Sequence, residues 1–84
     1  MKVYLIPSPE KLRETNDMIK WDRDRTEAWR FADEWAKNPE SARVTLELGR
    51  NAHLYRHYPN GKRQLLATMY VAAARDFVKE LTEA

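Results

Sequence analysis

The clearest hydrophobic pattern in the chain is an alternation of polar and apolar residues over residues 43–48, RVTLEL. Alternation with a period of two is typical of a β-strand that buries one face. A similar run at residues 52–57 follows after three residues. A three-residue loop sets Leu46 opposite Leu54, whereas a two-residue loop would set it opposite His53. Because the three-residue loop pairs apolar residues with one another, the pattern predicts a hairpin with a loop of that length.

This register divides the side chains of the hairpin between two faces. The first face is apolar and is predicted to lie beneath helices; it carries Val44, Leu46, Leu48, Ala52 and Leu54. The second face carries Arg43, Thr45, Glu47, His53, Tyr55 and His57. The chain has only two helical segments, so we expect the helices to cover one face and the second face to be open to water.

A second hairpin signal, Tyr58-Pro59-Asn60-Gly61-Lys62, follows these strands. Proline fixes φ, and Asn-Gly tolerates left-handed backbone conformations. The turn leads into a predicted strand at Arg63–Thr68. The type of turn decides whether Leu65 or Leu66 points inward, and the sequence leaves both alternatives open.

The N-terminal residues Met1–Ile6 are predicted to form a short strand that ends at Pro7. A helix start follows, because Ser8 can cap a helix and Pro9 suits its first position. No helix-breaking residue then occurs before Asn38-Pro39. We therefore favour one helix of about 28 residues.

The apolar stripe along this helix is clear only in its second half. It comprises Met18, Trp21, Ala28, Trp29, Ala32, Trp35 and Ala36. We expect the three Trp residues to close the helix against the sheet, and any Trp that overhangs the sheet to be available to a partner. Leu12, Thr15 and Ile19 lie on a different side of the helix. The alternative is therefore a break near Asp22–Arg25, where a capping-box spacing occurs.

Helical periodicity returns at Met69–Ala84, where Val71, Ala74, Val78 and Leu81 form one stripe. The order β-α-β-β-β-α predicts a single α+β domain over residues 1–84. It comprises a small antiparallel β-sheet with one long helix and a C-terminal helix on one face. The N-terminal strand could lie at an exposed edge of this sheet and pair with a second copy, which would give a homodimer.

Positive charge is concentrated in residues 43–63, which carry five Lys or Arg residues against one acid. The other 63 residues carry ten bases and twelve acids. A basic ribbon with interleaved His and Tyr residues is typical of a surface that binds a negatively charged partner. The candidate partner-binding residues are Arg43, Arg50, His53, Tyr55, Arg56, His57, Lys62 and Arg63. Basic residues at strand edges also discourage aggregation between sheets, and this protective role is the alternative.

The sequence offers no pattern typical of catalysis or of metal binding. It has no cysteine, no glycine-rich phosphate loop and no Ser–His–Asp signature. His53 and His57 would lie about 13 Å apart along a strand, too far to bind one ion. We expect no enzymatic activity, no catalytic or metal-ligating residue and no cofactor. Without cysteine, a signal-peptide core or an apolar run of about 20 residues, we expect a cytoplasmic protein that does not contact membranes.

The run Leu54–Arg56, with Tyr58, Pro59–Arg63 and a helix at Val71–Leu81, resembles the DNA-binding domains at the N-terminus of tyrosine recombinases. Those domains insert a three-stranded sheet into the major groove, but the chain departs from them in the long helix before its ribbon. In its size, its lack of cysteine and its lack of catalytic motifs, the chain is also similar to small phage-encoded anti-defence proteins such as anti-CRISPRs. That second likeness rests on no motif and assigns no residue roles.

Both resemblances and the residues themselves favour binding over catalysis. Anti-CRISPRs commonly block a surface of a nucleic-acid-handling complex. We therefore expect a non-enzymatic binding protein that docks its basic and aromatic sheet face on a protein complex with an acidic or nucleic-acid-binding surface, as a steric inhibitor or adaptor. The alternative is a module that binds DNA or RNA directly.

Overall fold

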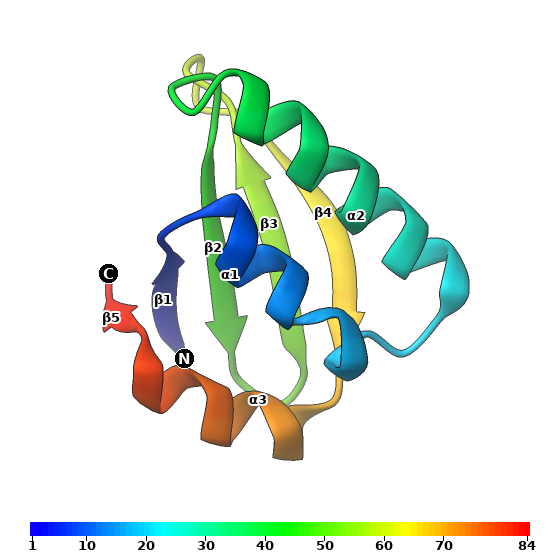
Figure 1. Cartoon of the computed structure of the whole chain (residues 1–84). Coiled ribbons are helices and arrows are strands. Elements are labelled where there is room, and N and C mark those ends of the chain that lie inside the picture. Colours follow the sequence, from blue (N-terminus) through cyan, green and yellow to red (C-terminus); the bar gives the residue numbers. More distant parts are fainter.

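The computed structural model describes residues 1–84, which form a five-stranded antiparallel sheet with helices on one face (Figure 1). The strands lie in the spatial order β4-β3-β2-β1-β5 and are β1 (Lys2–Ile6), β2 (Arg43–Leu48), β3 (Ala52–His57), β4 (Arg63–Met69) and β5 (Thr82–Glu83). The helices are α1 (Pro9–Glu14), α2 (Asp22–Lys37) and α3 (Val71–Phe77), with 3₁₀ turns η1 (Asn16–Met18) and η2 (Val78–Glu80). The predicted α+β fold is confirmed. No helix has the length and apolar character needed to cross a membrane.

The predicted register of the central hairpin is also confirmed. Leu46 pairs with Leu54, and the loop Gly49-Arg50-Asn51 has three residues. The apolar side chains of β2 and β3 lie in the core under the helices, where Val44, Leu46, Ala52 and Leu54 are at most 1% exposed. The alternate side chains point to the opposite face, over which no helix lies (Figure 1).

The strand after the second hairpin contains a bulge that settles the orientation of its two leucines. The pairing of β4 with β3 shifts by one residue next to Leu54 and Tyr55. As a result Leu66 lies in the core, where it is 3% exposed. Leu65 pairs with Tyr55, points to the face away from the helices, and is 45% exposed.

The prediction of one long N-terminal helix is wrong. The chain leaves α1 at Thr15, turns through η1 and runs extended at Ile19 before α2 begins. A straight helix of 28 residues would be about 42 Å long, whereas the longest dimension of the fold is 31 Å. The break therefore keeps both helices over the sheet. It lies before Asp22–Arg25, and the capping-box spacing there is not used, because Trp21 precedes α2 without a side-chain cap.

Contacts with β4 hold the segment between α1 and α2. The Lys20 N–H donates to the Thr68 carbonyl (3.2 Å), and the Tyr70 N–H donates to the Met18 carbonyl (2.9 Å). Ile19 forms an isolated bridge with Met69. These bonds cover the end of the outer edge of β4 and are available only if the helix is interrupted.

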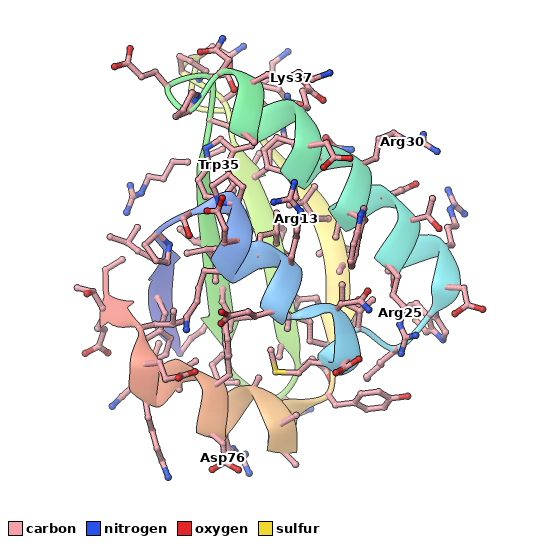
Figure 2. The ribbon with its side chains drawn as sticks, in the orientation of Figure 1. Arg13, Arg25, Arg30, Trp35, Lys37 and Asp76 are labelled. Atoms are coloured by element: carbon pink, nitrogen blue, oxygen red, sulfur yellow. The ribbon has the colours of Figure 1, made fainter.

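Only one of the three Trp residues closes a helix against the sheet. Trp35 is 5% exposed and its ring stacks on Phe31, with 6.0 Å between the ring centroids. Figure 2 shows Trp35 between α2 and the strands. Trp21 and Trp29 are 60% and 48% exposed. The predicted stripe assumed one continuous helix, and the break changes the orientation of α2 relative to the residues before it.

The C-terminal segment is only partly helical. Met69 completes β4, η2 ends at Glu80, and β5 pairs with Tyr4 and Leu5 of β1. The Ala84 N–H also donates to the Val3 carbonyl (2.7 Å). The edge of β1 that we predicted to pair with a second copy is therefore occupied by the chain's own C-terminal residues, and this route to a homodimer is closed.

Candidate functional site

The face of the sheet opposite the helices is the candidate site, and we call it the open face. Paired residues of an antiparallel sheet point to the same side, so the register identifies its members. They are Val3 and Leu5 on β1; Arg43, Thr45 and Glu47 on β2; His53, Tyr55 and His57 on β3; and Arg63, Leu65 and Thr68 on β4. The predicted row of His53, Tyr55 and His57 thus lies on a strand with neighbours on both sides, uncovered by any helix.

Arg63 spans the middle of the open face. Its Nη1 lies 2.7 Å from Oε2 of Glu47, two strands away. Its guanidinium carbon lies 4.1 Å from the ring centroid of Tyr55, on the strand between them. The ring of His53 lies 6.1 Å from that of Tyr55. The ion pair and the stacked ring hold Arg63 in one arrangement, which gives this part of the face a preformed shape.

His57 is held at the other end of the row. Its Nε2 lies 2.7 Å from Oγ1 of Thr45, and the two share a hydrogen bond. Burial lowers the pKa of His57, the nearby charges of Arg43 and Arg63 lower it further, and Glu47 opposes them. A hydroxyl–imidazole pair is also a feature of nucleophilic catalysis. Thr45, however, is 2% exposed, so this pair stabilises the sheet rather than facing a substrate.

Stability should fall as the pH is lowered through the titration of His57. The unfolded side chain titrates near 6.5 and the folded one below it, so the unfolded chain binds more protons between these values. The stability that neutral His57 contributes is fully present above about pH 7.5 and is lost as the pH falls through the pKa of His57 in the folded protein. Urea unfolding at pH values from 7.5 to 5 measures this fall in the free energy of unfolding. The fall should be smaller in His57→Gln than in the wild type, and in His53→Gln it should equal that of the wild type. Equal losses in the wild type and His57→Gln would contradict the assignment.

Arg56 does not belong to the open face, contrary to its predicted place among the partner-binding residues. It pairs with Val44 and therefore points to the helix side. Its guanidinium carbon lies 4.4 Å from the ring centroid of Phe31 and 4.5 Å from that of Tyr58. Its Nη2 lies 3.4 Å from Oε1 of Glu34, and the side chain is 15% exposed. Arg56 thus holds α2 against the β3–β4 hairpin.

Replacing Arg56 with alanine should therefore destabilise the fold by about 1–3 kcal/mol, because two aromatic contacts and the packing of its stem are lost. Arg43→Ala is the matched control on the exposed face, where a change within about 0.5 kcal/mol is expected. Urea denaturation followed by circular dichroism measures both. A destabilisation by Arg56→Ala no larger than that of the control would place Arg56 outside the packed layer.

The remaining predicted cations lie at the ends of the strands. Arg50 lies in the β2–β3 loop and Lys62 in the β3–β4 turn, and both are exposed. Gly61 in that turn has φ +88°, and the Asn60 Oδ1 accepts from the Lys62 N–H (3.0 Å). The two connections lie at opposite ends of β3, about 17 Å apart or more. Arg43, Arg50 and Lys62 make no ion pair, whereas Arg56 and Arg63 each make one.

Two exposed apolar residues that the predicted surface did not include lie on the open face, in the case of Leu65, or beside it, in the case of Trp21. Leu65 and Trp21 line a shallow hollow of about 480 Å³ together with Arg23, Asp24 and Glu27. The sequence predicts an exposed Trp only for the case in which one of the three overhangs the sheet, and Trp21 fits that case. Leu65 could be identified only once the bulge in β4 was known.

The open face presents three kinds of chemical group. It offers aromatic rings, fixed and free cations, and flanking apolar side chains, and no group of three or more His, Cys, Asp or Glu residues is placed to hold a metal ion. The two resemblances noted in the sequence stay predictions. In comparisons with protein-family models, with curated proteins and with solved structures, nothing matches this chain.

Proposed function

We propose that this protein is a non-enzymatic binding protein that docks its open face on an acidic surface of another protein and acts there as a steric inhibitor or adaptor. One observation carries the proposal: the uncovered sheet face presents Tyr55, Arg43 and exposed Leu65, the unpaired cations Arg50 and Lys62 lie in the connections at its two ends, and exposed Trp21 lies beside Leu65. Protein interfaces are enriched in Tyr, Trp and Arg, with apolar contacts at their centre and charges at their rim.

The pairing of charges inside the open face favours a protein over a nucleic acid as the partner. Nucleic-acid affinity depends on many cations that neutralise successive phosphates. Of the five predicted cations, Arg63 is paired with Glu47, and Arg56 is paired with Glu34 on the other side of the sheet. The three that remain are spread over both ends of the strands and supply few phosphate contacts.

The same charges favour an acidic partner surface over a nucleic-acid-binding one. Surfaces that bind nucleic acid are themselves basic, and like charges brought together across an interface cost several kcal/mol. Arg43, Arg50 and Lys62 would be repelled there. An acidic patch on a complex that handles nucleic acid agrees with both the charge of the open face and the expected inhibitory role.

Capture from a nuclease-treated host lysate tests the proposal. We expect the wild type to retain a protein, and the triple variant Arg43→Glu, Arg50→Glu, Lys62→Glu to lose it. The matched control carries the same change of charge on the helix side, as Arg30→Glu, Lys37→Glu, Arg75→Glu, and should retain the protein; Figure 2 shows Arg30 and Lys37 projecting from α2, and Arg75 is an exposed residue of α3.

Two results of this experiment would contradict the proposal. If nuclease removes everything that the wild type captures, and a labelled oligonucleotide binds with an affinity that falls linearly with the logarithm of the salt concentration, the protein binds nucleic acid directly. Loss of capture in the helix-side control instead would move the docking surface to the helices.

A further inference from the structure

One hollow of the surface lies on the open face, at the end that carries the β2–β3 loop. It has a volume of about 300 Å³. Its polar wall is formed by Glu47, Arg50, Asn51, His53, Tyr55 and Arg63. We call it the hairpin pocket, because all of its residues except Met1 come from β2, β3, the loop between them and the start of β4.

The hairpin pocket has a surplus of hydrogen-bond donors and one net positive charge. A guanidinium group has five N–H donors. The contact of Arg63 with Glu47 is made by one of its nitrogens, Nη1. The side chains of Arg50, Asn51 and His53 make no hydrogen bond within the chain. Several donors thus face a pocket in which Glu47 is the only anionic group.

We propose that the hairpin pocket receives the carboxylate of an Asp or Glu side chain of the partner; this inference rests on the proposed function and names the group that is recognised. A carboxylate is planar and accepts two parallel N–H bonds from a guanidinium fork. Its single negative charge balances the net charge of the pocket, in which Glu47 already neutralises one of the two Arg residues.

The surroundings favour a carboxylate on a protein over a phosphate on a nucleic acid. A nucleic-acid strand brings a phosphate with every nucleotide. The other unpaired cations proposed to meet the partner, Arg43 at the start of β2 and Lys62 after β3, lie about 14 Å or more along the strands from Glu47 and His53, and Lys2 beside Met1 points to the helix side. Nearer to the pocket are apolar groups: Met1 lines it, and Val3 and Leu5 lie on the adjacent strand of the same face. An isolated anion within a largely apolar contact fits these neighbours.

Glu47 acts as a positioning residue in this arrangement, because it fixes Arg63 but also competes with an incoming carboxylate. Replacing it with glutamine removes the competing charge. An anion-binding pocket should then bind acidic ligands more tightly, whereas a purely structural Arg63–Glu47 pair would show no such gain. The sign of the Glu47→Gln effect therefore separates the two roles.

Titration of the full chain with two short peptides tests the inference by NMR. In the first peptide, Glu residues alternate with Gly and Ala residues. The second peptide has the same sequence with every Glu replaced by Gln. We expect saturable shifts at Arg50, Asn51 and His53 with the first peptide only. Arg50→Gln should weaken this binding at least fivefold, Glu47→Gln should strengthen it, and Lys37→Gln, on α2 on the helix side of the sheet, should leave it unchanged. Because Arg50 lies in an exposed loop, its variant should fold like the wild type, which circular dichroism checks.

Each other outcome overturns the inference. Equal shifts with the Gln peptide would show that charge is not recognised, and an equal loss in Lys37→Gln would indicate diffuse attraction to the positive charge of the whole protein. Tighter binding of a single-stranded oligonucleotide at these residues would assign the pocket to phosphate. If the Glu peptide fails while the open face still captures a protein, only the pocket assignment is lost; if the peptide binds but no protein is captured, the proposed function fails and the pocket stands.

Discussion

Replacing Ile19 with alanine should lower the free energy of unfolding by about 2–5 kcal/mol, the usual cost of truncating a fully buried aliphatic side chain. Ile19 is 1% exposed, and its backbone bridges Met69 at the end of β4. Since small domains are marginally stable, a loss of this size should unfold a large share of the molecules at moderate urea concentrations.

Trp21→Ala is the matched control for this prediction. Trp21 lies only two residues further along the chain but is 60% exposed, so we expect a cost of about 1 kcal/mol or less. A continuous helix through this segment would give the reverse order, because Trp21 lies on its apolar stripe and Ile19 off it. Urea unfolding of both variants, followed by circular dichroism, compares them. A larger cost for Trp21→Ala would contradict the break between α1 and α2.

Replacing Tyr55 with alanine should weaken binding to the acidic protein partner about 30-fold or more, while the fold is retained. Truncation of a central interface residue costs about 2 kcal/mol or more, and about 1.4 kcal/mol corresponds to a tenfold change in affinity. Tyr55 lies on a strand inside the open face, and its ring supports Arg63 at 4.1 Å. The variant therefore loses both a contact and the position of an adjacent cation. Calorimetric titration of the captured partner measures the change.

Two further variants make the Tyr55 prediction specific. Tyr55→Phe keeps the ring that supports Arg63 and should lose less than tenfold in affinity. Trp29→Ala removes a more exposed aromatic side chain from α2, on the helix side of the sheet, and should change the affinity less than twofold. A loss with Trp29→Ala as large as that with Tyr55→Ala would argue against the open face as the docking surface.

The sheet could be predicted from the sequence because two local signals agree on it. The period of two in residues 43–57 and the length of the loop both place Leu46 opposite Leu54. The same parity places Arg56 on the side of Leu54, under α2. The charge of Arg56 argued against this position, because a largely buried guanidinium is plausible only when its partners, Phe31 and Glu34, are known to lie above it.

The breaks in the two helical segments could not be predicted from local sequence. Between Pro9 and Pro39 the chain contains neither proline nor glycine, and the one local signal for a break, the capping-box spacing near Asp22–Arg25, is not used in the structure. The interruption depends on two hydrogen bonds at the end of β4, from the Lys20 N–H to the Thr68 carbonyl and from the Tyr70 N–H to the Met18 carbonyl, which form only in the folded state. Likewise, β5 is two residues long and gains its pairing from β1, far away in the sequence.

NMR cross-saturation from the bound partner tests most directly whether the open face is the docking surface, because it reports which amides of this protein lie against the partner. We predict that the loss of signal intensity is strongest at β3, around Tyr55, extends to β2 and β4, and spares α1 and α3. A loss of intensity centred on α1 or α3, with the amides of β3 unaffected, would contradict the proposed function.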